Sequence, residues 1–85
     1  MRLDKYLKVS RIIKRRTIAK EACESGRVNI NGKIAKPGSE VKEGDIIEIR
    51  YANNVLSARI TNIKQHVVKE DAQNMYEIIS NTNIK

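Results

Sequence analysis

Three consecutive cations, Lys14, Arg15 and Arg16, stand directly before a stretch with the pattern of a short helix. The first turn of a helix has backbone N–H groups without partners and carries the positive end of the helix dipole, so it attracts anions. Cationic side chains beside such a start add charge and hydrogen-bond donors. The pattern therefore predicts a phosphate site, and the alternative is a solvated run of surface charge.

The charge of the chain is concentrated in its first third. Residues 1–27 contain nine Lys and Arg against three Asp and Glu, whereas residues 28–85 contain eight against seven. A basic region of this kind predicts a polyanionic partner, with nucleic acid first and an anionic membrane second. At 85 residues, the chain has room for one small domain and little room for a buried active site.

Other chemistry has little support in the sequence. The single histidine, His66, has no neighbouring ligand for a metal and is expected to be an exposed strand-end residue. Cys23 is expected to be a small core residue. The acidic residues between positions 40 and 48 are expected to lie on a solvated loop. No glycine motif for nucleotides and no nucleophile motif is present, so we expect a binding protein without enzymatic activity, metal or cofactor.

The N-terminal sequence MRLDKYLK lacks the apolar stretch of a signal peptide, and no run is long and apolar enough to span a bilayer. A single cysteine cannot form an internal disulfide. We therefore expect a cytoplasmic protein without membrane contact, and a monomer.

The basic residues must be positioned by two short helices. We expect a helix over residues 2–8, a connection anchored by Ile12 and Ile13, and a second helix over residues 16–25. Gly26 ends that helix. Its expected inner face consists of Ala19, Ala22 and Cys23, with help from Ile18. Arg16 and Lys20 are four residues apart and should point the same way.

From Arg27 onward the pattern alternates with a period of two. Asn31-Gly32 is a strong hairpin signal, and a return strand begins at Ile34. Further strands are expected over residues 46–51 and 55–63. An apolar stripe that includes Met75 and Tyr76 predicts a third helix over residues 70–79, with residues 80–85 frayed. The expected fold is one α+β unit with a small, mostly antiparallel sheet.

The anion is better explained as RNA than as DNA. The second helix offers Arg16 and Lys20 and then Glu21 and Glu24, which phosphates repel. A DNA-reading helix offers several side chains to base edges. Cations at a helix start suit contact with phosphates and riboses of shaped RNA.

Residues 2–50 resemble the S-four RNA-binding domain, also called the alpha-L motif. The resemblance is most specific in the helix leading into Gly26, then in Arg27-Val28-Asn29-Ile30-Asn31-Gly32, Val41 and Gly44-Asp45-Ile46. The family commonly has Ser where this chain has Arg15, so a side-chain cap of the second helix is lost at that position. The resemblance implies a single domain over residues 1–85, with the core motif at about 2–50 and a C-terminal strand and helix at 55–80.

Over nearly its full length the chain is similar to small bacterial factors of ribosome-associated quality control. This resemblance implies binding to the large ribosomal subunit that carries a stalled peptidyl-tRNA. It implies contact with large-subunit rRNA and the P-site tRNA, and support for RqcH, the factor that adds C-terminal alanine tails. The implied RNA-binding residues are Arg2, Lys5, Arg11, Lys14, Arg15, Arg16 and Lys20, with Arg27, Asn31 and Lys33 at the edge.

Two other functions stay open at this point. One is a general rRNA-binding or tRNA-binding protein in ribosome assembly or recycling, which would bind free rRNA or empty subunits. The other is a protein-interaction or DNA-binding module whose basic region is incidental. For Asn31 and Lys33, turn chemistry alone is an equally good explanation.

Overall fold

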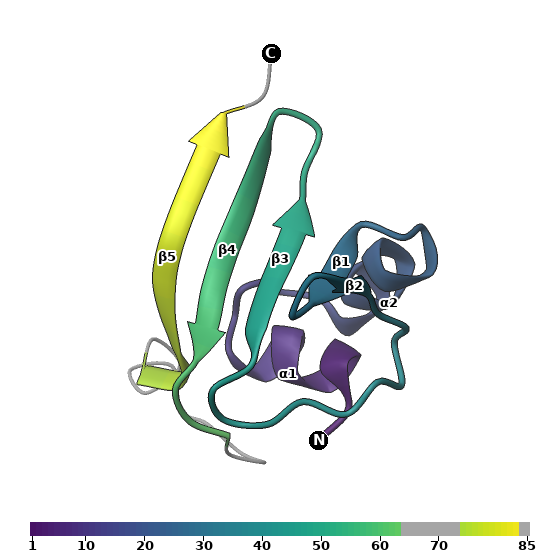
Figure 1. Cartoon of the computed structure of the whole chain (residues 1–85). Helices are drawn as coiled ribbons and strands as arrows, with labels where there is room; N and C mark the ends of the chain where they lie inside the picture. The colour runs from purple at the N-terminus through teal and green to yellow at the C-terminus, as the bar shows by residue number, and fades with distance from the viewer. Residues whose placement is uncertain (64–73, 84–85) are drawn as a thin grey trace.

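Two helices cover one face of a five-stranded antiparallel sheet (Figure 1). The structure is a computed structural model, and it describes residues 1–63 and 74–83. The elements are α1 (Leu3–Val9), α2 (Arg16–Glu24), β1 (Val28–Ile30), β2 (Lys33–Ile34), β3 (Ile46–Arg50), β4 (Asn54–Ile60) and β5 (Tyr76–Asn83). The strand order is β2-β1-β3-β4-β5. The predicted α+β class and antiparallel sheet are confirmed.

The two helices form where the sequence predicts them. α1 buries Leu3, Tyr6 and Leu7. α2 begins at Arg16, and its N-cap residue, Arg15, is extended and makes no side-chain hydrogen bond to the helix. Within the described ranges, no helix has the length and apolar character needed to cross a bilayer.

The inner face of α2 is narrower than predicted. Ala19 and Cys23 are buried and Ala22 is half-buried, but Ile18 is 48% exposed. In a helix, position 18 points about 100° away from position 19 and about 140° away from position 23, since successive residues are about 100° apart. The expectation that Ile18 helps form the inner face is therefore wrong.

The hairpin at Asn31-Gly32 is confirmed, and the structure supplies a reason for Asn31. Both residues have positive φ, 52° and 84°, as a tight primed turn requires. The Asn31 Nδ2 donates to Asp45 Oδ1 at 3.1 Å, and its Oδ1 accepts the Ile46 N–H at 2.9 Å. Asn31 thus ties the hairpin to the start of β3, which favours turn chemistry for this residue.

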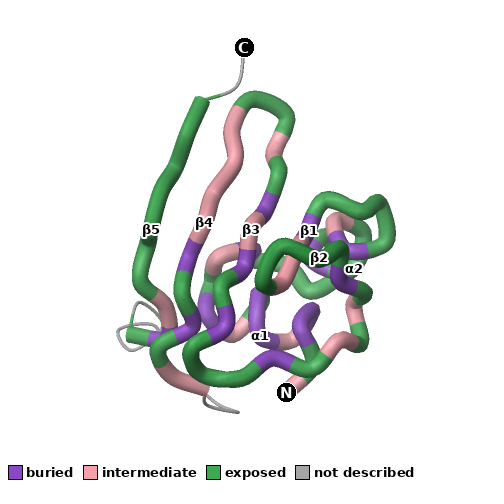
Figure 2. The backbone as a smooth tube through the Cα atoms, viewed as in Figure 1, coloured by how far each residue is buried: buried purple, intermediate pink, exposed green. Residues whose placement is uncertain are grey.

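The core lies between the helices and the lower part of the sheet (Figure 2). Tyr6 of α1 is fully buried, and its hydroxyl donates to the Met75 carbonyl oxygen at 2.7 Å. Burial, followed by the proximity of Tyr76, raises the pKa of the Tyr6 hydroxyl well above its usual value. The hydroxyl therefore stays protonated as a donor and joins α1 to the residue that precedes β5.

The predicted C-terminal helix is wrong for the described residues. Tyr76–Asn83 is a strand that pairs antiparallel with β4, from Ile60↔Tyr76 to Asn54↔Asn83. The apolar stripe that predicted a helix also contains adjacent β-branched residues at positions 78 and 79, which favour a strand. The edge of β4 provides backbone hydrogen-bonding partners for this segment, and pairing with that distant strand favours a strand over a helix. His66 and residues 70–73 of the predicted helix lie outside the described residues.

Three predicted core residues are confirmed, two near this strand and one in α2. Met75 is fully buried, and Tyr76 packs half-buried against the core. Cys23 is also buried, and its pKa is raised to about 11 by desolvation and, to a smaller extent, by the carboxylates of Asp4 and Glu24. At neutral pH the Cys23 side chain is therefore a thiol that packs as a small hydrophobe.

The Tyr6 hydrogen bond predicts a measurable contribution to stability. Tyr6→Phe should lower the free energy of unfolding by about 1 kcal/mol, or the melting temperature by about 4–8 °C. Tyr51→Phe is the control, because the Tyr51 hydroxyl has no hydrogen bond to any described residue. Equal melting temperatures for the two variants would contradict the assigned role.

The buried thiol predicts slow alkylation. With a pKa of about 11, the thiolate fraction at pH 8 is on the order of one in a thousand. We expect iodoacetamide to modify Cys23 at least tenfold more slowly in the native protein than in denaturant, and faster as the pH rises. Mass spectrometry over time measures this, and equal rates in the two states would contradict the burial.

Candidate nucleic-acid interface

A buried carboxylate lies between the starts of the two helices. The Asp4 side chain is only 3% exposed. Its Oδ1 lies 3.2 Å from Arg2 Nε and 3.5 Å from Arg16 Nη2, and its Oδ2 accepts a hydrogen bond from Arg2 Nη2 at 3.3 Å. One carboxylate thus holds side by side the guanidinium groups of Arg2, which caps the start of α1, and of Arg16, the first residue of α2.

This arrangement fixes the arginines and leaves them accessible. A buried carboxylate is costly unless it is paired, so both guanidinium groups are favoured in these positions. The Arg2 and Arg16 side chains nevertheless remain 52% and 48% exposed. Each guanidinium has five N–H donors, and Asp4 engages only part of them. The remaining donors are available to an external anion such as a phosphate.

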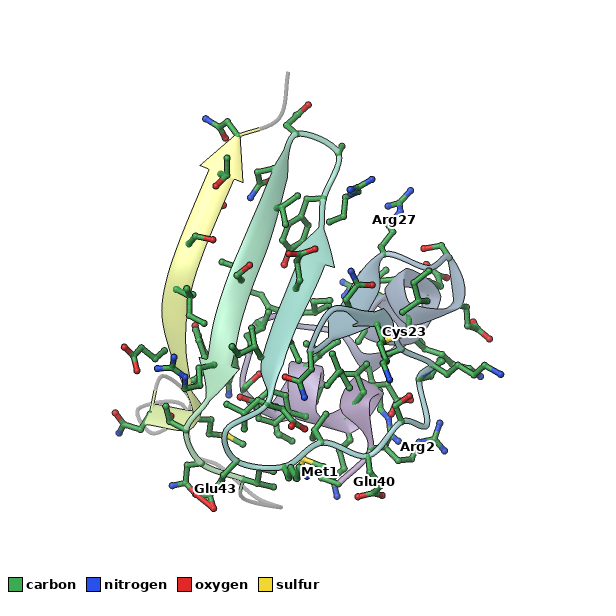
Figure 3. All side chains as sticks on the ribbon, viewed as in Figure 1. Met1, Arg2, Cys23, Arg27, Glu40 and Glu43 are labelled. Atoms are coloured by element: carbon green, nitrogen blue, oxygen red, sulfur yellow. The ribbon has the colours of Figure 1, made fainter. Side chains whose placement is uncertain are left out.

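The start of α1, and with it Arg2, is held by a distant loop. The Leu3 N–H donates to the Ser39 carbonyl at 2.8 Å, and the Asp4 N–H donates to the Pro37 carbonyl at 3.1 Å. The terminal amino group of Met1 pairs with Glu40 at 3.0 Å. These contacts place the N-terminal residues against the loop. Arg2 therefore occupies a defined position although it lies next to the chain end (Figure 3).

The paired arginines border a shallow hollow of about 350 Å³. We call this the α1–α2 hollow; it is lined by Arg2, Asp4, Arg16, Thr17 and Lys20. Arg16 and Lys20 lie one turn apart on the same side of α2, as the sequence predicted. The hollow combines three cations, one internal carboxylate and a hydroxyl, and it opens to solvent. Such a surface can bind the phosphate backbone of a nucleic acid.

Four further candidate cations lie on α1 and on the connection to α2, outside the residues that line the hollow. Lys5 is half-exposed on α1, and its backbone N–H donates to Asp4 Oδ1 at 2.8 Å. Arg11, Lys14 and Arg15 are exposed on the connection between the two helices. Arg11 has a φ of 62°, a left-handed conformation that marks the tight turn after α1.

Two candidates lie away from the α1–α2 hollow. Arg27 follows the C-terminal end of α2, and Figure 3 shows it well separated from Arg2. Arg27 lines different hollows, together with Ile18 on one side and Arg50 on the other. Lys33 is exposed on the edge strand β2. The structure therefore does not bring Arg27 into the same site as Arg2 and Arg16.

Sequence reasoning missed two residues of the α1–α2 hollow, Asp4 and Thr17. Nothing in the sequence marks Thr17 as a site residue except its position in the first turn of α2. A signal for Asp4 existed: it is the only acidic residue in the basic first twenty positions, and it is two residues from Arg2. Its burial, however, depends on the packing of α1 against α2, which the local sequence does not contain.

Comparison with known proteins agrees with the fold. A family model described as the S4 domain matches residues 1–47. The RQC P-site tRNA stabilizing factor of Halalkalibacterium halodurans is 56% identical over 78 residues, which cover 92% of this chain and 89% of that protein. The protein of the same name from Bacillus subtilis is 49% identical over 79 residues, 93% and 92% of the two chains.

A solved structure is similar over most of the chain. The trimeric structure of Heat Shock Protein 15 from Vibrio cholerae superposes with a TM-score of 0.85 at 32% identity, covering 94% of this chain and 82% of that one. The S-four resemblance predicted from the sequence is thereby confirmed. The chain belongs to the S4 domain family and, within it, to the group of the RQC P-site tRNA stabilizing factors.

Proposed function

We propose that this protein is an RNA-binding factor of ribosome-associated quality control. It binds the large ribosomal subunit that carries a stalled peptidyl-tRNA, and it contacts both large-subunit rRNA and the P-site tRNA. The observation that carries the proposal is the arginine pair held by Asp4 in the α1–α2 hollow. The name RQC P-site tRNA stabilizing factor, which relatives at 49% to 56% identity share, supports it.

The geometry favours contact with an RNA backbone. Arg2 and Arg16 are fixed, half-exposed guanidinium groups that suit bidentate contact with phosphate. Lys20 adds a third cation, while Arg11, Lys14 and Arg15 extend the charge along the adjoining connection. Such contacts set position and orientation and carry no base sequence information. The protein would therefore recognise the shape of an rRNA element.

The proposed mechanism is positional. The basic face docks on rRNA by charge and shape, and the docked domain then holds the P-site tRNA in place. A tRNA held in this way would remain available while RqcH directs the addition of C-terminal alanine. The protein itself performs no chemical step. It acts in the cytoplasm as one copy of a single domain over residues 1–85, with Lys5, Arg27 and Lys33 as further RNA contacts.

Reversing the charge at Arg16 tests the docking face. We expect Arg16→Glu to weaken binding to purified large subunits at least tenfold, since a phosphate contact is replaced by repulsion. Arg59→Glu is a matched control: its side chain is equally exposed, at 48%, and also pairs with a carboxylate, Glu77. Co-sedimentation measures binding, and circular dichroism verifies the fold of both variants.

Salt dependence provides a second readout of the same experiment. Arg16→Ala should flatten the log–log dependence of affinity on salt by roughly 0.7 to 0.9. A folded Arg16→Glu protein that still sediments with large subunits like the wild type would refute the proposed face. Equal binding to empty subunits and to free rRNA precursors, with no preference for tRNA-bearing subunits, would favour a role in ribosome assembly.

Removing the Asp4 charge should change subunit binding in the direction opposite to that expected from net charge alone. Asp4→Asn raises the net charge by one, yet it should weaken subunit binding by about 1 kcal/mol, or roughly fivefold, because Arg2 and Arg16 lose their shared anchor. Glu43→Gln adds the same charge on an exposed turn and should leave binding unchanged or slightly stronger. Tighter binding by Asp4→Asn would show that the position of the arginines is unimportant.

A further inference from the structure

A second pair of arginines lies on the other face of the sheet. β1 and β3 pair in the register Val28↔Ile49 and Asn29↔Glu48, and one step further along this register places Arg27 opposite Arg50. The Arg50 N–H donates to the Arg27 carbonyl at 2.8 Å. Val28 and Ile49 are buried on the face that the helices cover. Because side chains alternate along strands, Arg27 and Arg50 belong to the open face.

This arrangement is unfavourable for the protein alone. Like charges directly opposite each other on neighbouring strands repel and destabilise the pairing. Among the described residues, neither Arg27 nor Arg50 has a carboxylate within ion-pair distance, whereas Arg59 on the same sheet lies 3.7 Å from Glu77. The nearby Glu48 is half-buried and accepts a hydrogen bond from Asn29 at 3.4 Å. An unfavourable local arrangement that the rest of the protein does not offset is typical of a functional position.

The two arginines border a hollow of about 200 Å³. We call it the β1–β3 hollow; it is lined by Gly26, Arg27, Asn29, Ile34, Glu48 and Arg50. Figure 3 shows the Arg27 side chain extending outward just before the start of β1. Two exposed guanidinium groups on facing strands can bind one phosphate group between them. Binding of such an anion would also remove the repulsion between the arginines.

The β1–β3 hollow is separate from the α1–α2 hollow. Arg16, Thr17 and Lys20 lie on one flank of α2, while residues on the opposite flank border a different hollow that includes Arg27. About eleven residues of chain separate Arg16 from Arg27, most of them in a helix with a rise of about 1.5 Å per residue. The α1–α2 hollow is lined by residues at the starts of the two helices, whereas the β1–β3 hollow lies against the strands and shares none of those residues. The two hollows are therefore suited to two different RNA chains.

We propose that the β1–β3 hollow is the contact for the tRNA backbone, while the α1–α2 hollow docks on rRNA. This inference rests on the proposed function and divides its two RNA partners between two surfaces. The three cations that line the α1–α2 hollow suit docking on the ribosome. The smaller arginine pair suits a single phosphate contact to a second molecule. Arg50, which the sequence did not single out, becomes a tRNA-binding residue together with Arg27.

The test compares two kinds of large subunit. Affinities are measured for subunits with a P-site peptidyl-tRNA and for empty subunits, using the wild type, Arg27→Ala/Arg50→Ala, and Arg59→Ala as the control. The wild type should bind tRNA-bearing subunits more tightly. The double variant should lose this preference and bind both kinds as the wild type binds empty ones. Its salt dependence on tRNA-bearing subunits should flatten by roughly 0.7 to 0.9, the value for the one phosphate that the two arginines share.

The melting temperature of the free proteins distinguishes an RNA-binding role of the two arginines from a purely structural one. Because the double variant removes a repulsive pair, its melting temperature should equal or exceed that of the wild type. A clear decrease would mean that the arginines stabilise the fold, and it would overturn the inference.

The failures of the inference and of the proposed function are distinguishable. If the wild type prefers tRNA-bearing subunits and the double variant keeps that preference, the tRNA assignment is wrong and the proposed function stands. If the double variant weakens binding to both kinds of subunit equally, the β1–β3 hollow contacts rRNA and the assignment is also wrong. If the wild type shows no preference at all, the proposed role in holding tRNA fails together with the inference.

Discussion

The burial of Asp4 between α1 and α2 is the constraint on which the functional surface depends. A carboxylate removed from water requires positive partners, and here Arg2 and Arg16 supply them from the starts of two helices. The interaction links the position of one guanidinium to that of the other. It also links both to the packing of the helices on the sheet. The same contact that compensates for burial of the charge therefore presents two oriented cations at the surface.

The sheet supports this surface from the opposite side of the core. Tyr6 is fully buried in α1 and donates to the Met75 carbonyl just before β5. The loop at Pro37 and Ser39 accepts hydrogen bonds from the first residues of α1. Segments far apart in the sequence thus hold α1 in place. A helix of seven residues is not stable on its own, so the geometry of Arg2 and Asp4 depends on the whole fold.

The parts of the fold that could be predicted from the sequence are those with local causes. α2 ends where Gly26 permits positive φ, and the β1–β2 hairpin follows from Asn31-Gly32. β5 could not be predicted from its own sequence, because the apolar stripe favours a helix while the β-branched residues favour a strand. Pairing with the edge of β4, which is distant in sequence, selects the strand. The burial of Asp4 and the apposition of Arg27 and Arg50 also depend on contacts between distant segments. Charge composition identified the basic first third of the chain, but it did not show that Arg27 lies with Arg50 in a hollow separate from that of Arg2 and Arg16.

The central claim is that the α1–α2 hollow contacts large-subunit rRNA, and site-specific crosslinking tests it most directly. Thr17 lines the hollow and is exposed, so a photoreactive amino acid in its place would sit beside Arg2 and Arg16 without removing either. After irradiation of cells, the crosslinked RNA is purified under denaturing conditions and sequenced. We predict adducts concentrated in one element of large-subunit rRNA. Adducts with small-subunit rRNA, or protein adducts without RNA, would contradict the claim.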